Sequence, residues 1–191
     1  KILFLPTGIP DMSRIKAIAQ FGQQIWLDNL SRQLLDSGEL ARWITEDAIA
    51  GVTSNPAIFY NAMRSDAGYQ AEIVRLKNAA VDAEKRFEML VLPDVRNACD
   101  LFAVRHTASG GTAGFVSFEV SPALADDAAA TLNAARRLWQ EIGRPNAMIK
   151  IPATKAGLTA IADAIAEGIN VNVTLIFGPA QLAAVQAAYR A

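Results

Sequence analysis

Short apolar runs alternate with longer amphipathic stretches along this sequence, and the alternation limits the fold more than any other feature. Repeated strand and helix units of this kind are typical of a parallel sheet or a barrel, because each helix returns the chain to the start of the next strand. We predict strands at residues 24–28, 51–54, 115–120, 147–151 and 171–177. Helices are predicted at residues 13–21, 31–37, 66–77, 82–90, 93–104, 123–142, 155–167 and 179–191.

The chain length sets how much of a barrel these units can form. A (β/α)8 TIM barrel usually takes about 250 residues, whereas this chain has 191. The five units therefore correspond to about the first five of eight in an α/β barrel. No boundary interrupts the pattern, so we expect residues 1–191 to form one incomplete barrel domain. Such a piece would expose two sheet edges, and we expect it to aggregate unless the missing part covers them.

Composition excludes several classes of function. The formal net charge is −1 and no run of Lys and Arg occurs, which argues against nucleic acid or an anionic membrane as a partner. Cys99 is the single cysteine and His106 the single histidine, so neither a disulfide nor a zinc site is expected. No stretch approaches the roughly 20 apolar residues of a membrane span. We expect a soluble cytoplasmic protein without a bound metal.

Polar residues cluster at the C-terminal ends of the predicted strands. Side chains alternate across a strand, so residues two apart share a face. In barrels and parallel sheets this is the end where reactive groups converge. The residues concerned are Asp28, Thr53, Asn55, Ser117, Glu119, Lys150, Asn172 and Thr174. Their coincidence on successive strands predicts an active site.

Lys150, within the apolar segment Ala-Met-Ile-Lys-Ile-Pro, is the strongest single candidate for a catalytic residue. Burial disfavours the charged form of an amine, and a neutral amine attacks a carbonyl to form a Schiff base. Two structural alternatives remain open: Lys150 extends to water, or it forms a buried ion pair with Glu119. Asp28 and Glu119 could equally cap helices, and Asn55 before Pro56 could be an ordinary turn residue.

Other polar and aromatic residues carry weaker signals. We interpret His106 as a solvated loop residue and the Ser-Gly-Gly-Thr segment at 109–112 as a turn, because it precedes a strand and not a helix. Trp26, Trp43 and Trp139 are interpreted as core or helix-packing aromatics.

Five stretches resemble the transaldolase family, in particular its longer bacterial subgroup, which also occurs fused to phosphoglucose isomerase. The stretches are residues 25–32, 51–59, 116–122, 148–154 and 168–177. The resemblance implies the N-terminal part of a (β/α)8 barrel. It also implies transfer of a dihydroxyacetone unit from a ketose phosphate, such as sedoheptulose 7-phosphate or fructose 6-phosphate, to an aldose phosphate. This is a reaction of the pentose phosphate pathway that needs no cofactor and no metal.

The resemblance also implies roles for individual residues. Lys150 would form the Schiff base, Asp28 would take the proton of the substrate hydroxyl during carbon–carbon cleavage, and Glu119 would serve imine formation with a water held by Thr174. The substrate-binding residues would be Asn55, Asn172 and Thr53. The Arg and Ser that hold the substrate phosphate in the family are expected beyond the fifth strand. Residues 1–11 and 80–94 depart from the family pattern.

Two alternatives remain open. A smaller Schiff-base aldolase on the same barrel would cleave fructose 6-phosphate or a deoxyribose phosphate without an acceptor sugar. A non-catalytic barrel would have lost Lys150, Asp28 or Glu119, and all three are present. A homodimer and a fused phosphoglucose isomerase domain are both compatible with the sequence.

Overall fold

A single sheet of five parallel strands, in the order β1-β2-β3-β4-β5, organises the fold. The computed structural model describes residues 14–191, so Ser13 and residues 1–11 lie outside the described residues. The strands are β1 (Trp26–Asp28), β2 (Gly51–Thr53), β3 (Phe115–Glu119), β4 (Ala147–Pro152) and β5 (Val171–Thr174). Strand order follows chain order and helices connect the strands, as in the first five units of a (β/α)8 barrel. The predicted fold class is confirmed.

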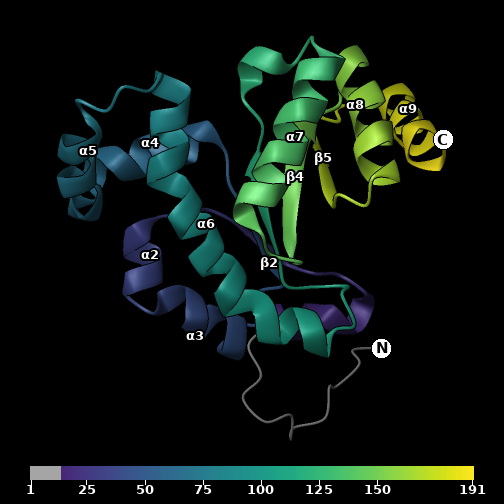
Figure 1. The fold of residues 1–191 in the computed structure, drawn as a ribbon. Coiled ribbons are helices and arrows are strands. Elements are labelled where there is room, and N and C mark those ends of the chain that lie inside the picture. The colour runs from purple at the N-terminus through teal and green to yellow at the C-terminus, as the bar shows by residue number, and fades with distance from the viewer. Residues whose placement is uncertain (1–13) are drawn as a thin grey trace, which may run out of the picture.

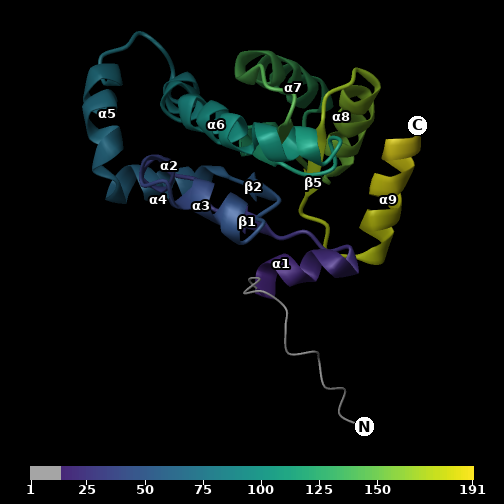
Figure 2. The same cartoon turned by 90° about the horizontal axis from the view of Figure 1, so that it is seen from below.

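Helices connect the strands and cover one face of the sheet. In Figures 1 and 2, α6, α7 and α8 follow one another across the sheet. Helix α6 contacts β3, α7 contacts β4, and α8 contacts β4 and β5. In both views α5 lies at the opposite end of the molecule from α9. The helices are α1 (Arg14–Ile18), α2 (Arg32–Asp36), α3 (Glu39–Glu46), α4 (Pro56–Ser65), α5 (Gln70–Leu76), α6 (Ala83–Ala108), α7 (Ala128–Ile142), α8 (Lys155–Ala166) and α9 (Pro179–Arg190), with 3-10 turns η1 (Ala19–Phe21), η2 (Ala67–Tyr69) and η3 (Pro122–Leu124).

The structure corrects several predicted elements. Helices α3 and α4 were missed, and β5 ends at Thr174 because Leu175 adopts a positive φ of 62°. The two helices predicted at residues 82–90 and 93–104 form one continuous helix, α6, which contains Pro93. Proline lacks the N–H that an interior helical residue donates, which usually ends a helix. Here Leu92 and Val95 are buried on either side of Pro93, so tertiary packing holds the helix together.

The hydrophobic core lies between the sheet and these helices. Val52, Val116, Phe118, Ile149 and Ile151 alternate with the polar candidates along the strands and are fully or almost fully buried. They pack with apolar residues of α6, α7 and α8 in one cluster. The opposite face of the sheet is therefore the face that carries the polar residues.

The described part of the sheet has two open edges, because β1 pairs only with β2 and β5 only with β4. Large apolar side chains are exposed on and beside β5, among them Leu175, Phe177 and Tyr189. A cavity of about 570 Å³ lies between α8, α9 and β5, and it is lined by Ile161 and Val173. This edge has the apolar character of a surface that further chain would cover.

Gly51 gives a test of packing at the start of β2. A Cβ added there would lie 2.6 Å from the ring of Trp26 and 2.8 Å from the carbonyl oxygen of Phe115. We expect Gly51→Ala to lower the free energy of unfolding by about 1–3 kcal/mol, the usual cost of overpacking. Thermal unfolding of this variant should be compared with that of Gly178→Ala, where nothing lies within 4 Å of the added Cβ. Equal melting temperatures would contradict the prediction.

Candidate active site

The strand register places the polar candidates on one face of the sheet. Asp28 is paired with Thr53, and Thr53 with Ser117. Two residues further along β3, Glu119 is paired with Lys150, and Lys150 with Asn172. Paired residues in a parallel sheet point to the same side, and so do residues two apart. Thr174 joins this set because it is two residues after Asn172.

Lys150 is the centre of this face. Its side chain is 11% exposed, and its Nζ lies 3.3 Å from Oε2 of Glu119. The same Nζ donates a hydrogen bond to the backbone carbonyl of Ser54 at 3.3 Å. The ion pair that the sequence left open is therefore present. It is equally the arrangement in which a carboxylate removes a proton from an ammonium, since the two groups are close to hydrogen-bond distance.

Asn172 lies beside Lys150 on β5 and is held by β3. Its Nδ2 donates to Oγ of Ser117 at 2.9 Å, and Ser117 is fully buried. The amide oxygen of Asn172 then remains available to an incoming hydroxyl group. Ser117 was recognised in the sequence as sharing a face with Glu119, but its contact with Asn172 depends on a residue 55 positions away.

Asn55 has a structural role, but as a helix cap and not as the ordinary turn residue that the sequence left open. It is the N-cap of α4, and its Oδ1 accepts a hydrogen bond from the backbone N–H of Ile58 at 2.9 Å. Its amide nitrogen is still a donor, so capping and substrate binding are compatible. Substrate binding by Asn55 stays a prediction.

Thr53, Asp28 and Thr174 differ in their surroundings. The Oγ1 of Thr53 is buried and has no hydrogen-bond partner among the described residues. Asp28 is exposed at the end of β1, and the described part of the chain gives its carboxylate no hydrogen bond or ion pair. Thr174 is partly buried at the end of β5. The strand register brings these three residues to the site face, and among the described residues none of their side chains forms a hydrogen bond or ion pair with Lys150.

The structure also shows the positions of the histidine and tryptophan residues that were not assigned to the active site. His106 lies within α6, where its Nδ1 is 2.9 Å from the carbonyl oxygen of Ala113, so its interpretation as a solvated loop residue is wrong. Trp26 stacks on Phe115 on the site face, with ring centroids 6.4 Å apart, whereas Trp43 and Trp139 pack against the hydrophobic core. Within residues 14–191, no group of three or more His, Cys, Asp or Glu residues could hold a metal ion.

These features define a β/α-barrel protein with an ion pair between a buried lysine and a partly buried glutamate at the carboxyl edge of its sheet. A family model described as Transaldolase/Fructose-6-phosphate aldolase matches residues 25–191. The chain belongs to this family, and the suspected resemblance is confirmed.

Curated relatives agree with this assignment. The transaldolase of Thiobacillus denitrificans is 48% identical over 178 residues, which are 93% of this chain and 50% of the relative. The transaldolase of Neisseria gonorrhoeae is 50% identical over the same shares of both chains. Transaldolase 2 of a Nostoc species is 49% identical over 87% of this chain and 44% of the relative. The chain thus spans about half the length of the curated relatives it matches.

In the part that the structure describes, no helix has the length and apolar character needed to cross a membrane.

Proposed function

We propose that this chain carries the Schiff-base lysine of a transaldolase. The protein would transfer a dihydroxyacetone unit from a ketose phosphate, such as sedoheptulose 7-phosphate or fructose 6-phosphate, to an aldose phosphate. The observation that carries the proposal is the buried Lys150 Nζ, 3.3 Å from a carboxylate oxygen of Glu119. Relatives that are 48–50% identical and named transaldolase support it.

The proposed mechanism assigns a step to each residue. Glu119 takes a proton from the Lys150 ammonium, and the neutral amine attacks the substrate carbonyl, with loss of water, to form an imine. A water held by Thr174 serves proton transfer in imine formation and hydrolysis. Asp28 takes the proton of the substrate hydroxyl, the adjacent carbon–carbon bond breaks, and its electron pair moves into the protonated imine.

Substrate binding completes the proposed site. Asn55, Asn172 and Thr53 would hold the hydroxyl groups of the bound three-carbon unit. The unpartnered hydroxyl of Thr53 supports this role, because a buried polar group without a partner is costly unless a ligand or water satisfies it. Phosphate binding is assigned to parts of the protein beyond the fifth strand.

The wider context follows from the same proposal. Residues 1–191 would form one incomplete barrel domain of an enzyme of the pentose phosphate pathway in the cytoplasm. The proposed chemistry needs no cofactor, because the imine itself accepts the electrons. A homodimer and a fused phosphoglucose isomerase domain both remain compatible with the chain.

Trapping of the imine tests the proposal. The full protein is incubated with fructose 6-phosphate and borohydride, and its intact mass is measured. We expect a reduced three-carbon adduct, which proteolytic mapping should place on Lys150. A folded, full-length protein that acquires no adduct would refute the proposed function.

An aldolase without an acceptor is the second candidate, because the matched family model is named for both transaldolase and fructose-6-phosphate aldolase. The two functions differ in the fate of the three-carbon unit. A transaldolase should turn over only when an acceptor aldose phosphate is added. An aldolase would release free dihydroxyacetone continuously from fructose 6-phosphate alone.

A further inference from the structure

Asp28 ends an edge strand of only three residues, and its carboxylate has no hydrogen-bond partner among the described residues. Its position therefore depends on the backbone on either side of it. The ladder to β2 fixes the preceding side through Trp26, Leu27 and Asp28 itself. The following side is the short connection to α2, in which Leu30 is fully buried.

The first turn of α2 is held by residues from distant parts of the chain. The backbone N–H of Arg32 donates to the hydroxyl of Tyr69 at 3.1 Å, and that of Gln33 donates to Oδ2 of Asp66 at 2.7 Å. The N-cap Ser31 accepts from the N–H of the following turn. All three donors at the start of the helix are thus satisfied, two of them by the segment between β2 and β3.

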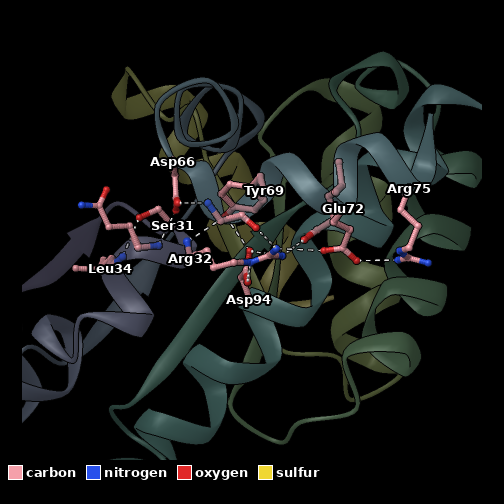
Figure 3. Close-up of polar contacts among 11 residues, drawn as sticks. Ser31, Arg32, Leu34, Asp66, Tyr69, Glu72, Arg75 and Asp94 are labelled. Atoms are coloured by element: carbon pink, nitrogen blue, oxygen red, sulfur yellow. Dashed lines mark hydrogen bonds and ion pairs between the residues drawn. The ribbon is translucent and has the colours of Figure 1, made fainter.

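The Arg32 side chain ties the same turn to α6, as Figure 3 shows. Its Nε lies 3.1 Å from Oδ1 of Asp94, and its Nη2 donates to the carbonyl of Leu90 at 3.0 Å. The guanidinium carbon lies 4.4 Å from the centre of the Tyr69 ring. Arg32 therefore makes planar, charge-assisted contacts that fix its orientation.

Tyr69 joins the backbone and side-chain parts of this network. Its hydroxyl accepts from the N–H of Arg32 and donates to Oδ2 of Asp94 at 2.8 Å. Tyr69 is fully buried and Asp94 almost fully buried. Burial raises the pKa of Tyr69, so its hydroxyl stays protonated and remains a donor at neutral pH. Arg32, Tyr69 and Asp94 lie in α2, η2 and α6, and none of the hydrogen bonds and ion pairs among them involves Glu119 or Lys150. We therefore expect imine formation to proceed without the network.

We propose that Arg32, Tyr69 and Asp94 are positioning residues that hold the β1–α2 connection, and through it the carboxylate of Asp28, at the site of carbon–carbon cleavage. This inference rests on the proposed function. A buried network that fixes a backbone segment four residues from a proton acceptor affects the cleavage step alone. Imine formation at Lys150 and Glu119 should proceed without it.

Tyr69→Phe separates the two steps. The substitution keeps the ring beneath Arg32 and the direct contact of the Arg32 guanidinium with Asp94, but it removes the hydroxyl that links the backbone N–H of Arg32 to Asp94. We expect carbon–carbon cleavage to slow by roughly tenfold to a hundredfold, with an unchanged KM for the ketose phosphate. Borohydride trapping with fructose 6-phosphate should then give mainly the uncleaved six-carbon adduct, whereas the parent protein gives the three-carbon adduct.

Controls distinguish this role from a structural one. Tyr60→Phe, on an exposed tyrosine of α4, should leave the three-carbon adduct and the rate unchanged. Arg32→Lys keeps the charge but loses the planar contacts, and should also favour the six-carbon adduct. Parent-like adducts in Tyr69→Phe would overturn the proposal, and loss of both adducts would show a purely structural role. A parent protein that forms no adduct would instead refute the proposed function itself.

Discussion

Lys150→Met is expected to abolish the reduced adduct and to lower the transfer rate by roughly 10⁴-fold or more, because the covalent route is lost. Methionine is unbranched and apolar, so it fits the space of the buried lysine stem without its amine. The measurements are intact mass after borohydride trapping and the steady-state rate with fructose 6-phosphate and an acceptor aldose phosphate.

Lys155→Met is the matched control for this prediction. Lys155 is exposed at the start of α8, five residues from Lys150, and has no ion pair within the described part of the chain. This variant should keep both adduct and activity. An adduct that persists in Lys150→Met, or moves to Lys155, would contradict the assignment of the Schiff base. Thermal unfolding should accompany the assays, because Glu119 loses its partner in the Lys150 variant.

Arg32→Met is expected to lower the free energy of unfolding by about 3–5 kcal/mol, because it leaves the buried carboxylate of Asp94 without its cation. Only 3% of the Asp94 side chain is exposed, so water cannot replace the lost contacts. Burial already raises the pKa of Asp94, which shows that its charge is poorly solvated. Urea denaturation of the full protein measures the effect.

Two further variants test the cause of this loss. The double variant Arg32→Met with Asp94→Leu removes both charges, and it should recover most of the stability lost in the single variant. Arg42→Met provides the surface control, since Arg42 pairs with Glu39 and Glu46 on the exposed face of α3 and should change stability by less than about 1 kcal/mol. A large effect of Arg42→Met, or none of Arg32→Met, would contradict the argument.

The candidate site shows what local sequence patterns can and cannot predict. Residues two apart on one strand were correctly assigned to one face, because strand alternation is a local rule. The pairing of Glu119 with Lys150 was left open and is now observed. The contact of Asn172 with Ser117 and the capping of α2 by Asp66 and Tyr69 were not predicted. These contacts join residues more than 30 positions apart, and no local pattern encodes them.

Helix boundaries show the same division. The end of the helix predicted at residues 123–142 is confirmed, since α7 ends at Ile142 and Gly143 adopts the left-handed conformation that glycine favours after a helix. Separate helices were predicted at residues 82–90 and 93–104, but burial of Leu92 and Val95 on either side of Pro93 keeps α6 continuous. A proline inside a helix costs about 3 kcal/mol relative to alanine. Packing of the neighbouring side chains in the core outweighs this cost in α6.

The sequence alone determined the alternation of strands and helices, the α/β barrel class, and the polar residues at the strand ends. Each of these depends on the periodicity of side chains along a few neighbouring residues. The tertiary structure alone decided the shared face of Asp28, Glu119, Lys150 and Asn172, and the network that anchors α2 beside it. Register and long-range packing bring distant residues together, and they exist only once the chain has folded.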